Sequence, residues 1–136
     1  MPRKELLGEK GFTLIELMVT VAITLLALVG YVGANLVLQQ TTSDTFERTV
    51  ALQDANRVIE QMRNNASSGN FPGSVTAAYP NNGTVAGFNS LTNELVTVSY
   101  TDATADPLTV TVNVRWLQGG RRTVNASLRT LITQRT

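Results

Sequence analysis

The first third of the chain is one long apolar run. Between Leu17 and Ser43 there is no charged residue, and the apolar positions leave no continuous polar face. As a helix that rises ~1.5 Å per residue, residues 12–38 would extend ~40 Å, which exceeds the ~30 Å of a bilayer's hydrocarbon core. The pattern therefore predicts a helix in this part of the chain that spans a membrane.

After residue 43 the apolar positions become periodic. Phe46, Val50, Ile59 and Met62 recur at helical spacing, with charged residues between them. This pattern predicts an amphipathic helix over residues 41–66 that buries these four side chains in the core of a small head. Because no proline or glycine separates this segment from the apolar run, we expect one continuous helix from about residue 12 to residue 66.

The last third alternates apolar and polar residues. Three such runs occur, and the central one contains Val110, Val112 and Val114. The pattern predicts a three- to four-stranded antiparallel meander over residues 95–136, with these valines in the head core. Residues 67–94 are rich in Ser, Gly, Asn and Pro and are expected to be a loop between helix and sheet. The expected fold class is α+β, with the helix packed on one face of the sheet.

The composition excludes several kinds of functional site. The chain has no cysteine and no histidine. It therefore lacks disulfides, the usual general base and the commonest metal ligand. We expect no catalytic residue, metal or cofactor, and no enzymatic activity. The chain has 11 basic and 10 acidic residues. Three of the basic and two of the acidic residues lie in the first 11 positions, so the rest of the chain has eight of each. A neutral remainder gives no electrostatic reason to expect nucleic-acid binding.

The junction between the polar start and the apolar run is distinctive. Residues 1–11 are polar and end in Gly11, Phe12 opens the apolar run, and Glu16 follows four residues later. A carboxylate at this depth is costly in lipid unless it is paired, so a plain anchor has no use for it. The arrangement resembles the class III prepilin leader of type IV pilins and pseudopilins.

The resemblance implies a processing site and an assembly site. A prepilin peptidase on the cytoplasmic side would cut between Gly11 and Phe12 and methylate the new amino terminus of Phe12. The Glu16 carboxylate would then pair with the Phe12 amine of a neighbouring subunit. Two alternatives from the residues alone are an uncleaved signal anchor and a glutamate that reaches the lipid headgroups.

The resemblance also implies a function. The chain would be a structural subunit of a type IV pilus. The runs VNVRW at 112–116 and GGRRTV at 119–124 are similar to minor pilins of the pilus-modification (V) kind and to I-type minor pseudopilins. The expected role is that of a minor pilin in pilus assembly, initiation or a tip complex. The alternatives are a minor pseudopilin of a type II secretion or DNA-uptake system, for which DNA would be a partner, and a membrane-anchored periplasmic binding domain.

Location and partners follow from the same pattern. Arg3, Lys4 and Lys10 precede the apolar run and place the amino terminus in the cytoplasm, with the head in the periplasm. We expect a cleaved leader at 1–11, a membrane and assembly helix at 12–40, and a bacterial inner-membrane subunit that later enters a surface pilus or periplasmic pseudopilus. Its partners would be other pilin subunits, the prepilin peptidase and methyltransferase, and the inner-membrane assembly platform. The predicted membrane and filament-core residues are Leu14, Ile15, Leu17, Met18, Val19, Val21, Ile23, Leu25, Leu26, Leu28 and Val29.

Overall fold

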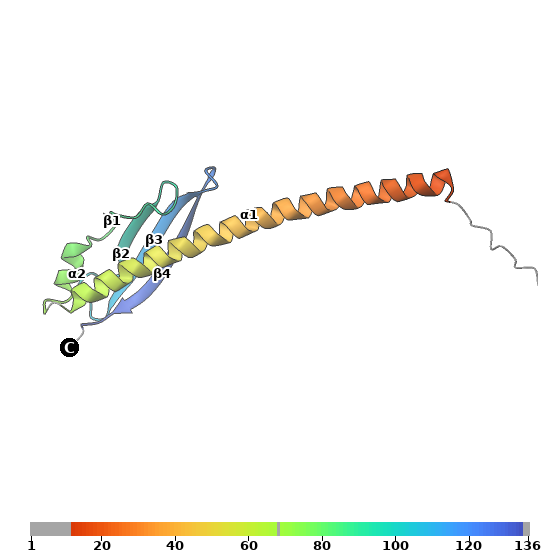
Figure 1. The fold of residues 1–136 in the computed structure, drawn as a ribbon. Helices are drawn as coiled ribbons and strands as arrows, with labels where there is room; N and C mark the ends of the chain where they lie inside the picture. Colours follow the sequence, from red (N-terminus) through yellow and green to blue (C-terminus); the bar gives the residue numbers. More distant parts are fainter. Residues whose placement is uncertain (1–11, 68, 135–136) are drawn as a thin grey trace, which may run out of the picture. The chain divides into compact units, whose positions relative to one another are not determined.

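The computed structural model describes residues 12–67 and 69–134. Its elements, in chain order, are α1 (Leu14–Ala66), α2 (Gly73–Ala78), β1 (Gly83–Val85), β2 (Leu95–Tyr100), β3 (Leu108–Gln118) and β4 (Arg122–Ile132) (Figure 1). The chain divides into two compact units at residues 40 and 41, and α1 contributes to both.

The first unit is the amino-terminal part of α1. This helix is long and apolar enough to cross a membrane. The polar side chains that interrupt the apolar run bond within the helix. Thr20 Oγ1 donates to the Glu16 carbonyl at 2.7 Å, Thr24 Oγ1 donates to the Thr20 carbonyl at 2.8 Å, and Asn35 Nδ2 donates to the Tyr31 carbonyl at 2.9 Å. Because these donors are satisfied locally, their cost in an apolar environment is reduced.

The helix α1 ends where its sequence changes to small polar residues. The Ser67 N–H donates to the Asn64 carbonyl at 3.3 Å, and Ser67 Oγ donates to the same oxygen at 2.6 Å. Gly69 follows with a positive φ of 34°, a conformation that glycine adopts at little cost. The two Ser67 contacts satisfy the Asn64 carbonyl, which the last helical turn would otherwise leave unpaired.

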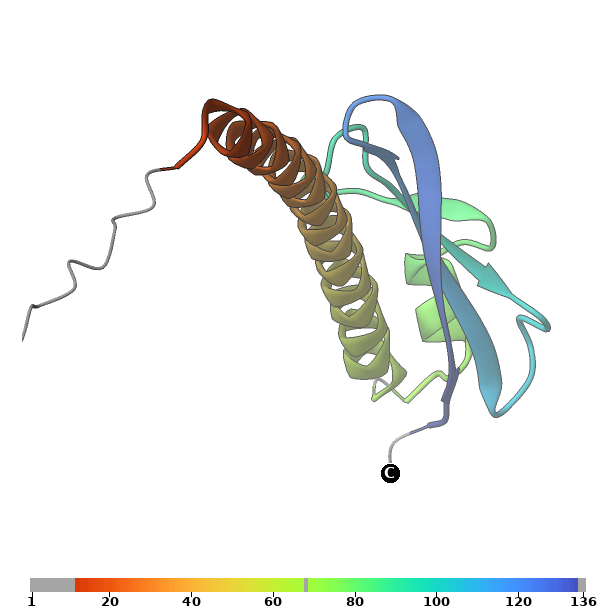
Figure 2. The ribbon, with the colours of Figure 1, turned by 90° about the vertical axis from the view of Figure 1, so that its right-hand side faces the viewer.

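The second unit, residues 41–136, contains a four-stranded antiparallel sheet with the strand order β1-β2-β3-β4. Val98 lies opposite Val112 across β2 and β3, and Val112 lies opposite Leu128 across β3 and β4. Figure 2 shows the carboxyl-terminal turns of α1 running along one face of this sheet. The α+β architecture expected from the sequence is therefore confirmed.

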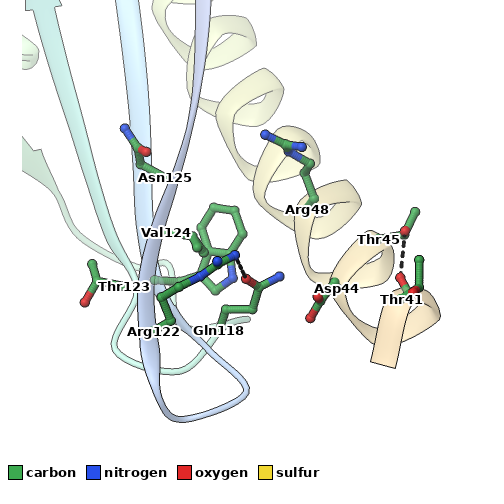
Figure 3. Close-up of a pocket in the computed structure, with 10 residues that line it drawn as sticks. Thr41, Asp44, Thr45, Arg48, Gln118, Arg122, Thr123, Val124 and Asn125 are labelled. Atoms are coloured by element: carbon green, nitrogen blue, oxygen red, sulfur yellow. Dashed lines mark hydrogen bonds between the residues drawn. The ribbon is translucent and has the colours of Figure 1, made fainter. Parts of the chain in front are cut away.

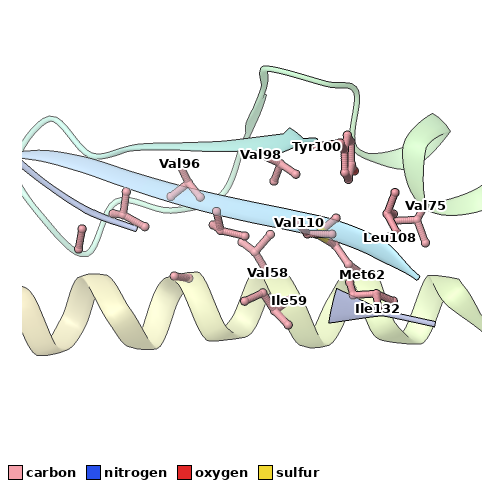
Figure 4. Packing of buried hydrophobic residues seen from close by; sticks show 14 of the residues in the cluster. Val58, Ile59, Met62, Val75, Val96, Val98, Tyr100, Leu108, Val110 and Ile132 are labelled. Atoms are coloured by element: carbon pink, nitrogen blue, oxygen red, sulfur yellow. The ribbon is translucent and has the colours of Figure 1, made fainter. Parts of the chain in front are cut away.

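The core of the head lies between α1 and the sheet (Figure 4). Small and branched side chains recur on one face of the helix and permit close packing against the valine-rich strands. On α1 the buried hydrophobic residues are Ala51, Ala55, Val58, Ile59, Met62 and Ala66; on β2 and β3 they include Val96, Val98, Val110, Val112 and Val114. Val75 of α2 is also fully buried.

The predicted apolar stripe of the helix begins too early in the chain. Phe46 is 69% exposed, so its assignment to the head core is wrong, and Val50 is only half-buried. At ~100° per residue, Phe46 lies ~140° around the helix from Ala51, the first fully buried position. The buried face is therefore set by Ala51, Val58 and Met62, and Phe46 points away from it.

The connection at residues 67–94 contains structure that the sequence did not reveal. It holds α2 and the three-residue strand β1, which adds a fourth strand to the sheet. Asn82 has a positive φ of 57°, and a Cβ on Gly83 would lie 2.7 Å from the Pro80 carbonyl oxygen. The Asn-Gly pair therefore makes the tight turn that leads the chain into β1. Elements this short have too few residues to show a period.

Candidate functional site

The amino-terminal end of α1 is closed by Thr13 and Glu16. The Glu16 N–H lies 3.4 Å from Thr13 Oγ1, and the Thr13 hydroxyl lies 3.5 Å from Glu16 Oε2. Threonine followed three residues later by glutamate is the sequence signature of a capping box. Here the Glu16 N–H donates to the Thr13 side chain as in that motif, while the Glu16 carboxylate accepts from the Thr13 hydroxyl. Both contacts are at the long end of hydrogen bonding, so the carboxylate is oriented without being tightly held.

Glu16 is a carboxylate on an apolar surface. Leu14, Ile15, Leu17 and Met18 around it are exposed, and Glu16 is exposed with them. The helix amino terminus favours a negative charge, typically by about 0.3–1 kcal/mol. Across the described residues, the first basic side chain after Glu16 is Arg48, which belongs to the other unit. No basic side chain among the described residues of this segment is therefore available to pair with Glu16.

The predicted processing pair is only partly described. Gly11 lies outside the described residues, and Phe12 is 81% exposed just before the helix begins. A new amine at Phe12 would stand four residues before Glu16, close to one helical turn away along the chain. Because that distance is short, the two groups belong to the same end of the helix.

The predicted membrane and filament-core residues form an apolar surface with no protein covering it in this unit. All eleven residues named for this role, from Leu14 to Val29, are between 50% and 79% exposed. Soluble monomers rarely leave so large an apolar surface exposed to water. The surface therefore requires lipid or other apolar helices around it.

A second contact, which the sequence did not reveal, joins α1 to the end of β3. Trp116 Nε1 donates to Glu47 Oε2 at 3.0 Å, and the Gly119 N–H donates to Glu47 Oε1 at 3.5 Å. The Glu47 carboxylate thus accepts hydrogen bonds both from the buried Trp116 at the end of β3 and from Gly119 in the β3–β4 turn. The pairs are 69 and 72 residues apart in the chain, so no local pattern predicts them.

An open polar groove of about 680 Å³ lies beside this contact. Figure 3 shows Asp44 and Arg48 on the helix, with Arg122 and Gln118 at the strand ends. Arg122 Nη2 donates to Gln118 Oε1 at 3.0 Å, and Thr45 Oγ1 donates to the Thr41 carbonyl at 2.8 Å. The groove contains charges of both signs. Over residues 12–67 and 69–134, no cluster of three potential metal ligands occurs.

The perturbed tyrosines of the head have structural partners. Burial, with a smaller effect of Tyr79, raises the pKa of Tyr100 to about 12. The Tyr100 hydroxyl donates to the Tyr79 carbonyl at 2.7 Å. Tyr100 therefore stays protonated at physiological pH and holds the end of β2 against the segment before β1.

Comparison with known families finds a match at the start of the chain. Residues 7–32 match the family described as the prokaryotic N-terminal methylation motif. No curated protein and no solved structure matches the chain. The matched segment contains Phe12, Thr13 and Glu16 and ends inside the exposed apolar part of α1.

Proposed function

We propose that this chain, a structural subunit of the type IV pilin and pseudopilin class by its class III prepilin leader, is a minor pilin that takes part in pilus assembly. The leader and the apolar helix together indicate anchoring in a membrane by a single helix. Its partners in this class are other pilin subunits and a prepilin peptidase. The finer assignment to a minor pilin is the proposal.

The observation that carries the proposal is the position of Glu16. It stands at the first turn of a helix whose other side chains there are apolar and exposed, and its one described side-chain partner is Thr13. Cleavage between Gly11 and Phe12 would create a positive amine at the same helix end. Each charge is costly alone in lipid, and pairing lowers the cost of both.

Pairing between subunits sets the register of assembly. If Glu16 of an incoming subunit meets the Phe12 amine of its neighbour, the two helices are fixed in one axial position. The apolar residues from Leu14 to Val29 then exchange lipid contacts for contacts with like helices. Because both environments are apolar, the hydrophobic effect contributes little to this step, and the charge pair and helix packing direct it.

The proposed course begins in the inner membrane. Arg3, Lys4 and Lys10 keep the amino terminus in the cytoplasm, where the peptidase cuts, and the head lies in the periplasm. The assembly platform then moves the processed subunit from the membrane into the filament. In this proposal a partner supplies the energy for the movement.

The β3–β4 hairpin supports a minor subunit over a major one. It contains the VNVRW and GGRRTV runs, with Gly119 and Gly120 at positive φ of 55° and 70° in the turn. A minor pseudopilin of a secretion or DNA-uptake system is the alternative. DNA binding that weakens steeply with salt would favour the uptake system.

The test of the proposal is incorporation of a Glu16→Val variant into filaments sheared from the host cells. We expect normal cleavage and membrane insertion and at least a tenfold loss of the variant from the filament fraction. Thr20→Val is the matched control, because Thr20 bonds only within its own helix, to the Glu16 carbonyl. Equal incorporation of Glu16→Val and wild type would overturn the proposed role of Glu16.

A further inference from the structure

Two carboxyl groups that are not part of the proposed assembly site are buried together in the head. Asp54 lies on the core-facing side of α1 and is only 8% exposed. Glu94 lies just before β2 and is half-buried. Asp54 Oδ2 and Glu94 Oε1 are both inaccessible to solvent, and neither accepts a hydrogen bond from any described donor. Burying two oxygens without hydrogen-bond partners destabilises the folded state, unless a group between them satisfies both.

The two carboxyl groups face each other. Asp54 is the charged residue that acts on Glu94, and their side chains are within hydrogen-bonding reach. Burial above all raises the pKa of Glu94 above its ordinary value, and the Asp54 charge raises it further. Backbone N–H groups act in the opposite direction, and that of Leu91 donates to Glu94 Oε2 at 3.1 Å. Oε1 is thus the Glu94 oxygen left for Asp54.

Among the described residues, no basic side chain forms an ion pair with Asp54 or Glu94. On α1, Arg57 is exposed and its guanidinium carbon lies 5.9 Å from the centre of the Phe88 ring, while Glu47 accepts from Trp116. On β3, Arg115 lies opposite Leu95 and is exposed. A bound calcium ion would need six or more oxygen ligands, and the described residues supply no third acidic ligand here.

We propose that Glu94 Oε1 carries a proton and donates it to Asp54 Oδ2, so that the pair forms a pH-sensitive latch between α1 and residues 86–94. A single proton satisfies both orphaned oxygens and removes the repulsion between two negative charges. The proposal does not depend on the role of the chain in a pilus.

The latch holds residues 86–94, which make few other contacts with the rest of the head. Phe88 and Leu91 pack partly buried against the core, and the Leu117 N–H donates to the Thr92 carbonyl at 2.8 Å. Ionisation of Glu94 would place two negative charges in contact beneath this segment. Residues 86–94 would then separate from α1 while the sheet remains paired, so the surface of the head next to β2 changes with pH.

The sign of the pH effect follows from the raised pKa of Glu94. The folded chain binds this proton more tightly than the unfolded chain does. The stabilisation is therefore complete below the ordinary glutamate pKa and is lost as the pH rises through the folded value. Asp102 affects stability in a different pH range. Hydrogen bonds from Thr104 lower the pKa of Asp102, so its contribution to stability is lost only as the pH falls through this lowered pKa.

The experiment is thermal unfolding of the processed chain in detergent micelles between pH 4.5 and 8.5. We expect the wild-type Tm to fall by about 5 °C over this range. Asp54→Asn and Glu94→Gln should flatten the dependence, because each amide donates to the remaining carboxylate without a titrating proton. Asp44→Asn, an exposed acid on the same helix, is the matched control and should behave like wild type.

A direct readout separates the latch from a merely structural role. The carboxyl carbon of Glu94, followed by nuclear magnetic resonance, should titrate above the ordinary glutamate range in wild type and shift downward in Asp54→Asn. An ordinary midpoint, or parallel Tm profiles for all variants, would overturn the proposal. A rise in wild-type Tm on addition of Ca²⁺ that Asp54→Asn abolishes would overturn it in favour of a metal site. If Asp54→Asn fails to fold, the wild-type titration decides.

Discussion

Trp116 on β3 and Glu47 on α1 form a 3.0 Å hydrogen bond from Nε1 to Oε2 at the edge of the head core. The indole is 2% exposed, so its N–H has no access to water and requires a protein partner. This bond fixes the end of the sheet against the helix at the point where the buried face of α1 begins.

Loss of that acceptor should destabilise the head. Glu47→Ala leaves the indole N–H buried and unpaired, with an expected cost of about 1–3 kcal/mol in the free energy of unfolding. Glu47→Gln keeps an acceptor and should cost less. Glu60→Ala is the control, because Glu60 forms an exposed pair with Arg63 and should cost about 0–1 kcal/mol. Urea unfolding measures all three, and equal costs for Glu47→Ala and Glu60→Ala would contradict the account.

The corrected helix face makes a second prediction. Met62 is fully buried, whereas Phe46 is largely exposed. Met62→Ala should lower the free energy of unfolding by about 2–5 kcal/mol through lost burial and a cavity. Phe46→Ala should change it by no more than about 0.5 kcal/mol, although phenylalanine is the larger side chain. The reverse order in urea unfolding would restore Phe46 to the core.

The pattern of apolar residues predicts some elements of the fold and not others. Long periodic segments were predicted because burial repeats along them: the helix to Ala66 and the valine strand β3 are where the pattern places them. Phe46 has the helical spacing to Val50 that predicts a core position. The structure shows it exposed, because the buried face of α1 begins only at Ala51. The strand β1 has three residues, too few to alternate visibly.

Pairs that are distant in the chain have no sequence signature. Glu47 with Trp116 and Asp54 with Glu94 meet only because α1 packs on the sheet. By contrast, the Thr13–Glu16 spacing is a local capping signature, and the Glu16 N–H donates to Thr13 Oγ1 as this spacing predicts. The candidate site at the helix start was thus predictable from local sequence, and the buried polar contacts of the head were not.

The turn into β1 provides a third prediction. A methyl group at Gly83 would lie 2.7 Å from the Pro80 carbonyl oxygen, so Gly83→Ala forces the backbone to shift. We expect a loss of about 1–3 kcal/mol and faster hydrogen exchange in β1. Gly73→Ala is the matched control, because the nearest neighbours of its methyl group would be Asn70 side-chain atoms at 3.5 Å or more. Similar behaviour of the two variants would show that the turn does not require glycine.

Processing provides a fourth prediction. Gly11→Trp should block cleavage, because the bulky side chain occupies the position next to the bond that the peptidase must approach. The precursor should then remain in the membrane at full length, as detected by immunoblotting of membrane fractions. Gly30→Ala is the control, since its methyl group has open space and lies far from the cut in sequence. Mature protein from Gly11→Trp would show that the cut lies elsewhere.

The measurement that tests the central claim most directly is the intact mass of the chain purified from the membranes of its own host. The account predicts the mass of residues 12–136 plus one methyl group, which would place the chain in the prepilin pathway. The mass of all 136 residues, in cells with an active prepilin peptidase, would contradict it. The chain would then be an uncleaved membrane-anchored domain, and Glu16 would have no amine of Phe12 with which to pair.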